Sequence, residues 1–98
     1  MAHTYMKLYE NEYRSIEILI RDMCEEDFNP DTATAHIEDV DGTTIMEETT
    51  CMVIANKIRV IVPTDVTNVK GMYNVIWTII KDGNTFKHKT ILNVEELT

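Results

Sequence analysis

The stretch Thr64–Val94, TDVTNVKGMYNVIWTIIKDGNTFKHKTILNV, decides the fold of this chain. It contains a polar corner, a long run of aromatic and β-branched residues, a tight turn and a returning apolar run. The dipeptide Asp82-Gly83 is typical of a two-residue β-hairpin turn. With this dipeptide at the turn, Trp77 faces His88 across the hairpin. A register one residue away would mix polar and apolar side chains on both faces, so we predict the first register.

The predicted hairpin has two faces of different composition. We predict that one face forms the core, and its members are Tyr73, Val75, Trp77, Ile79, Phe86, Leu92 and Val94. The opposite face combines four apolar side chains with two lysines, namely Met72, Ile76, Ile80, Ile91, Lys87 and Lys89. Because exposed apolar patches often mark contact surfaces, this second face is a candidate interaction surface. The sequence leaves open whether the N-terminal strand or a loop covers it.

The alternation of apolar and polar residues also occurs in the first half of the chain. The segment Arg14–Arg21 places three isoleucines on one face at period-two spacing, which predicts a strand. A hairpin over residues 33–47 is expected, with a type I′ turn at Asp41-Gly42. This turn would pair Ile37 with Met46 on a shared core face.

A further hairpin is predicted between Cys51–Ile54 and Ile58–Val62. Asparagine tolerates the left-handed conformation, so Asn56 is the expected turn residue between these strands. Pro63 lacks a backbone donor and is expected to end the second strand. No segment shows a convincing helical pattern.

About seven strands separated by turn signals are typical of a β-sandwich, although a small open barrel has a similar pattern. The corner before Tyr73 favours the sandwich, because the tyrosine hydroxyl can bond back to the entering chain, as in the tyrosine corner of immunoglobulin-like domains. We therefore predict one all-β domain over residues 1–98, an immunoglobulin-like antiparallel β-sandwich. Residues 1–12 are expected to be either an edge strand or an arm that docks on a neighbour. Tyr5 and Tyr9 suit either role and join the interaction candidates.

The composition of the chain excludes several classes of function. Its 98 residues carry a net charge of −8, which disfavours binding to phosphate backbones. The apolar runs are too short to cross a membrane, and the N-terminus lacks the pattern of a secretion signal. We expect synthesis in a cytoplasm and binding to neither nucleic acid nor membrane. The two cysteines, Cys24 and Cys51, are expected to be free thiols in a reducing compartment.

The sequence contains no arrangement that predicts catalysis or metal binding. The acidic segment Asp22–Thr32 lacks the spacing of a calcium loop, so we interpret it as a solvated loop. No spacing brings a histidine to either cysteine, as nucleophilic catalysis requires. Adjacent carboxylates such as Glu95-Glu96 diverge in an extended strand. We therefore expect a non-enzymatic protein without a cofactor.

Four segments, taken in order, resemble one family. They are the strand Ile16–Arg21 with its polar loop, ATAHIEDVDGTTI at 33–45, TDVTNVKGMYNVIWTI at 64–79 and KDGNTFKHKTILNV at 81–94. Their order and spacing resemble the immunoglobulin-like domain of bacteriophage structural proteins, such as the N-terminal domain of phage baseplate upper proteins. The resemblance implies a virion component of the tail, baseplate or neck, and a capsid-associated component is included in the prediction. It also implies action through contacts with other virion proteins, without enzymatic activity.

In baseplate upper proteins this domain precedes fibre or receptor-binding segments, whereas the present chain ends at Thr98. The Met1 start favours a complete small protein, which would be a connector, decoration or adaptor subunit. Such a subunit would be a homo-oligomer repeated in a symmetric assembly. The resemblance transfers no individual binding residues. The alternative function is a carbohydrate- or surface-binding module, for which Phe28 in the acidic loop is the best candidate, because Trp77 falls on the core face.

Overall fold

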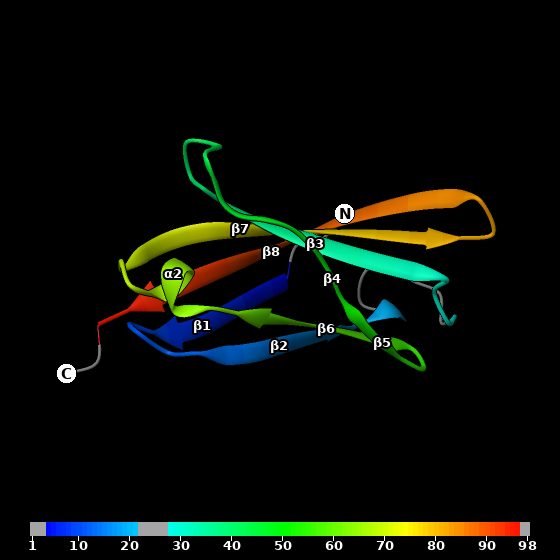
Figure 1. Ribbon diagram of the computed structural model, residues 1–98, viewed down its shortest axis with the longest axis horizontal. Helices are drawn as coiled ribbons and strands as arrows, with labels where there is room; N and C mark the ends of the chain where they lie inside the picture. Colours follow the sequence, from blue (N-terminus) through cyan, green and yellow to red (C-terminus); the bar gives the residue numbers. More distant parts are fainter. Residues whose placement is uncertain (1–3, 22–27, 97–98) are drawn as a thin grey trace.

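The computed structural model describes residues 4–21 and 28–96, and every structural statement below concerns these residues. They form eight strands in two packed sheets (Figure 1). The larger sheet has the order β1-β8-β7-β3-β4 and consists of β1 (Thr4–Tyr9), β8 (Asn84–Glu95), β7 (Gly71–Lys81), β3 (Thr32–Asp39) and β4 (Thr44–Thr50). The smaller sheet has the order β2-β6-β5 and consists of β2 (Arg14–Leu19), β6 (Lys57–Val62) and β5 (Met52–Ile54).

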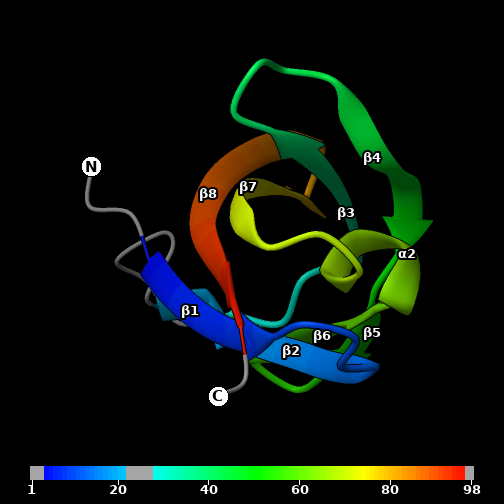
Figure 2. The same cartoon turned by 90° about the vertical axis from the view of Figure 1, so that its left-hand side faces the viewer.

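This strand order is that of an immunoglobulin-like sandwich. β2, β6 and β5 take the places of strands B, E and D, while β3, β7 and β8 take those of C, F and G. The predicted fold class is confirmed, with eight strands in place of about seven. One detail differs, because β1 runs parallel to β8 and the larger sheet is therefore not wholly antiparallel. The molecule measures 43 × 23 × 23 Å, and Figure 2 shows it along its length.

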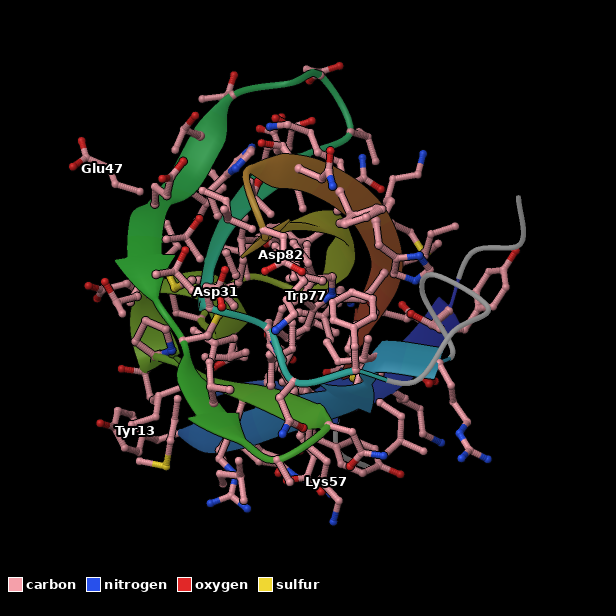
Figure 3. All side chains as sticks on the ribbon, turned by 90° about the vertical axis from the view of Figure 1, so that its right-hand side faces the viewer. Tyr13, Asp31, Glu47, Lys57, Trp77 and Asp82 are labelled. Carbon is pink, nitrogen blue, oxygen red and sulfur yellow. The ribbon has the colours of Figure 1, made fainter. Side chains whose placement is uncertain are left out.

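The core lies between the sheets and is built from alternate residues of the strands. In β7, every second side chain from Tyr73 to Ile79 is buried. Trp77 lies opposite His88, which is the predicted register. Its indole Nε1 donates a 2.8 Å hydrogen bond to the hydroxyl of Thr90, deep in the interior seen in Figure 3. The predicted core face is thus confirmed, except at Phe86.

Phe86 is 36% exposed and does not belong to the buried core. It faces Ile79 as predicted, but the tip of the β7–β8 hairpin extends past the smaller sheet (Figure 1). Its ring packs instead against Phe28, with the two centroids 5.7 Å apart. The register of a hairpin determines which face a side chain occupies, and it does not determine how far the opposing sheet extends.

The corner that leads into β7 contains a short helix that the sequence analysis did not predict. Pro63 ends β6 as expected, and the next residues, Thr64–Thr67, form α2. A single helical turn is too short to produce a periodic apolar pattern, so the sequence gives no signal for it. The hydroxyl of Tyr73 donates a 2.6 Å hydrogen bond to the carbonyl of Val69, which confirms the predicted tyrosine corner.

The β3–β4 turn differs in type from the predicted one. Gly42 has a φ angle of 86°, but Asp41 is not in the left-handed region, so the predicted type I′ turn is wrong. A two-residue turn at Asp41-Gly42 would pair Glu38 with Ile45. Glu38 pairs with Thr44 instead, so the loop has one residue more than a two-residue turn. An irregularity in the next step of the ladder compensates, and Ile37 still pairs with Met46 as predicted.

The β5–β6 turn also differs from the prediction. Its left-handed residue is Ala55, with a φ angle of 53°, and the expectation for Asn56 is wrong. Lys57 belongs to β6 and pairs with Ile54, so the turn has two residues and its first adopts the unusual conformation. The carbonyl of Asn56 accepts a 2.8 Å hydrogen bond from the amide of Ile20, which ties this turn to the chain beyond β2.

The N-terminal segment is an edge strand of the larger sheet. β1 pairs with β8 from Thr4 beside Thr90 to Tyr9 beside Glu95. The side chain of Leu8 is 1% exposed and belongs to the core. The segment was predicted to be either an edge strand or an arm that docks on a neighbour. In the structure it is an edge strand that packs on its own chain.

Candidate interaction surface

The predicted interaction residues lie on one face of the larger sheet, opposite the core. The register places Tyr5 beside Ile91, and Ile76 between His36 and Lys89. β1, β8 and β7 are neighbours, so these side chains form one continuous surface. We call it the outer face, and its members are Tyr5, Tyr9, Met72, Ile76, Ile80, Lys87, Lys89 and Ile91.

The apolar side chains of the outer face are accessible to solvent. Met72 is 47% exposed and Ile80 is 40% exposed. Ile76 and Ile91 are half-buried between neighbours of the same sheet. β1 was one candidate to cover this face, but it lies beside β8 as part of the same sheet. Within residues 4–21 and 28–96, Figures 1 and 2 show no strand or loop packed over this face. Binding at this surface stays a prediction.

The two tyrosines at the β1 edge have different surroundings. Tyr5 is 73% exposed and, with Met72 and Ile91, lines a shallow depression of about 360 Å³. Tyr9 is half-buried, and the ammonium group of Lys7 lies 5.4 Å from its ring centroid. An aromatic ring this exposed beside apolar neighbours is a frequent anchor of protein interfaces, so Tyr5 is better placed for contact than Tyr9.

A second apolar surface lies on the outer side of the smaller sheet, and the sequence analysis missed it. Met52, Ile54 and Ile61 are 58%, 40% and 48% exposed. An ion pair of 2.9 Å between Arg59 and Glu17 crosses the same side of that sheet. The signal was present in β5, where three consecutive apolar residues must place at least one side chain outside the core.

The aromatic residue considered for carbohydrate binding is partly enclosed. Phe28 packs against the core cluster and against the ring of Phe86. Trp77 has no exposed surface. Phe28 keeps part of its surface exposed and lines a shallow depression of about 320 Å³ with Asn29 and Asn56.

Two of the side chains considered for nucleophilic catalysis, Cys51 and His88, are buried, whereas His36 is half-buried. Burial raises the pKa of the Cys51 thiol to about 12, so the thiol is protonated at neutral pH and is a poor nucleophile. His88 is 4% exposed, and its Nε2 lies 3.2 Å from the hydroxyl of Thr4. It contributes to the packing of β1 on β8. Cys24 and most of the acidic segment lie outside the described residues.

Among residues 4–21 and 28–96, no three His, Cys, Asp or Glu side chains are grouped so that they could hold a metal ion. No helix found there has the length and apolar character needed to cross a membrane. In comparisons with known proteins, the chain matches no family model and no curated protein.

Proposed function

We propose that this chain is a non-enzymatic structural component of a bacteriophage virion, in the tail, baseplate, neck or capsid surface. It contacts other virion proteins through the outer face of its larger sheet. The setting is supported by the resemblance of the four ordered segments to phage immunoglobulin-like domains. The contact surface is supported by one observation, the accessible apolar side chains Met72 and Ile80 on β7, the strand that pairs with the lysine-bearing part of β8.

Charged side chains surround the apolar ones on this surface. Lys87 and Lys89 lie on it, and the register adds Lys7, Glu38 and Glu95 to the same face. An apolar centre with a polar rim is the usual composition of a protein interface. A contact here would remove the exposed parts of Tyr5, Met72 and Ile80 from water, which contributes about 25 cal/mol per Å² of apolar area.

The experiment measures incorporation into particles. A phage lacking the gene is complemented with the wild-type chain or with Met72→Ser/Ile80→Ser, and density-gradient-purified particles are analysed by quantitative mass spectrometry. We expect the wild type in a fixed ratio to the major particle proteins. Loss of the apolar contact should lower incorporation of the double variant by about tenfold or more.

Ile61→Ser is the matched control, because Ile61 is equally exposed but lies on the smaller sheet. It should be incorporated like the wild type. Absence of the wild-type chain from purified particles contradicts the virion assignment. Equal losses in the control and the double variant contradict the choice of surface.

A further inference from the structure

β5 is an edge of the smaller sheet with apolar residues exposed along its whole length. In the order β2-β6-β5 it is the last strand, and no other described strand lies beyond it (Figure 1). It pairs with β6 through Met52 beside Arg59 and Ile54 beside Lys57. Met52, Val53 and Ile54 are all exposed. The open side of this strand is therefore a place where another strand can be added to the sheet.

The hydrogen bonds of the β5–β6 hairpin show which backbone groups point to the open side. The carbonyl of Asn56 accepts from the amide of Ile20, beyond β2, so the next amide in the chain, in the same planar trans unit, points the other way, to β5. Directions alternate along an antiparallel strand, so Met52 and Ile54 are hydrogen-bonded to β6. The amide and carbonyl of Val53, between them, point away from β6.

Cys51 agrees with this direction and limits how a new strand can pair. It lies two residues before Val53, and its amide donates a 2.9 Å hydrogen bond to the carbonyl of Ala33 in the other sheet. This amide is not available to an incoming strand, and Ala55 already belongs to the turn. Val53 makes no hydrogen bond on its open side to the residues that the structure describes. A new ladder on this edge is therefore centred on Val53.

β5 differs from the other edge strands in having no charged side chain. The edges of the two sheets are β1, β4, β2 and β5. Lys7 lies on β1, Arg14 and Glu17 lie on β2, and Glu47 and Glu48 lie on β4. Charged residues on an edge strand oppose pairing with another chain, and β5 lacks this protection.

A second copy of the same strand is complementary to this edge. Two β5 strands related by a twofold axis run antiparallel, and Val53 of each copy then donates to and accepts from Val53 of the other. In this register Met52 of each copy lies beside Ile54 of the other, so apolar side chains meet and no like charges oppose each other. Copies that carry a net charge of −8 repel each other, and here they meet at a strand without a carboxylate.

We propose that two copies of this chain pair through their β5 strands in this antiparallel register and join their smaller sheets into one. The contact uses the same strand of both copies, so it closes at the dimer. It lies on the smaller sheet and leaves the outer face of both copies accessible, so the inference goes beyond the proposed function. A ladder of three residues makes a small interface, and small interfaces are weak.

The test is sedimentation equilibrium with both cysteines reduced, up to about 0.5 mM chain because the interface is small. We expect the wild type to dimerise reversibly. Met52→Glu/Ile54→Glu opposes like charges at both Met–Ile contacts and should weaken the dimer about tenfold or more. Met52→Glu/Ile54→Lys places opposite charges at the same contacts in this register. It should dimerise about tenfold or more tightly than the first variant, and less tightly at about 0.5 M salt.

Val40→Glu/Val69→Glu is the matched control, because it adds the same charge at exposed apolar positions that lie outside β5. It should dimerise like the wild type, and cooperative urea unfolding should show that every variant is folded. A wild type that is monomeric throughout overturns the inference. So does equal weakening of the control and the first variant, or a Met52→Glu/Ile54→Lys variant that dimerises no better than the first. None of these results bears on incorporation of the wild type into particles, so the proposed function is judged separately by Met72→Ser/Ile80→Ser.

Discussion

Tyr73 shows how one polar contact of a single residue fixes a corner of the fold. Its hydroxyl donates to the carbonyl of Val69, four residues earlier, and so holds the chain where it turns into β7. In Tyr73→Phe, this carbonyl loses its donor while the ring keeps its place in the core. We expect the free energy of unfolding to fall by about 1 kcal/mol, measured by urea denaturation with an unchanged slope.

Tyr5→Phe is the control for this prediction, because Tyr5 is 73% exposed and its hydroxyl makes no hydrogen bond to the residues that the structure describes. It should leave stability within about 0.5 kcal/mol of the wild type. Equal urea midpoints for Tyr73→Phe and the wild type would mean that water replaces the corner contact without loss.

At the scale of elements, the β7–β8 hairpin has the turn with the strictest requirement on backbone conformation. Asp82 and Gly83 both adopt positive φ angles, 52° and 79°. The amide of Asp82 also donates a 2.9 Å hydrogen bond to the carboxylate of Asp31. In Gly83→Ala, the new Cβ meets no other atom, so the cost comes from the left-handed backbone alone. We expect a loss of about 1 kcal/mol in the free energy of unfolding, measured by thermal denaturation.

Asn84→Ala tests the neighbouring position, which begins β8 and has no positive φ angle. It should have little effect on stability. A loss as large as that of Gly83→Ala would indicate that side-chain contacts, and not the backbone conformation, stabilise the turn.

The hairpins also show which parts of the fold could be predicted from the sequence. The alternation of apolar residues predicts a register well, because a slip by one position exposes every core side chain. Ile37 thus pairs with Met46 although the turn beside them is of another type than expected. Turn type depends on only two or three residues and on ladder irregularities, so Ala55 could not be identified as the left-handed residue.

The candidate surface was predictable in part, for the same reason. Alternation placed Met72, Ile80 and Ile91 on the face opposite Trp77, and the strands have that arrangement. The exposure of that face depends on where β1 lies, which no local pattern determines. The open edge of β5 depends on strand order, and strand order results from contacts between distant parts of the chain.

At the scale of the whole molecule, β1 joins the first part of the described chain to the last. Leu8 is 1% exposed in the core, and its neighbour across the ladder is Val94. In Leu8→Ala, a cavity forms at the junction of β1 with the core. We expect the free energy of unfolding to fall by about 2–4 kcal/mol, measured by urea denaturation.

Tyr5→Ala provides the comparison on the same strand, because its side chain faces solvent. It should change stability by less than about 0.5 kcal/mol. If Leu8→Ala is equally mild, β1 is not packed on the core in solution and acts as a detached arm.

The parallel pairing of β1 with β8 also determines how the domain responds to mechanical load. Thr4 begins β1 and Glu95 ends β8, and the two strands lie side by side in the same direction. A pulling force applied between Thr4 and Glu95 slides one strand along the other. All the backbone hydrogen bonds between them are then loaded together, in shear, and cannot open one after another from an end. This geometry makes the ladder between the first strand, β1, and the last strand, β8, a mechanical clamp.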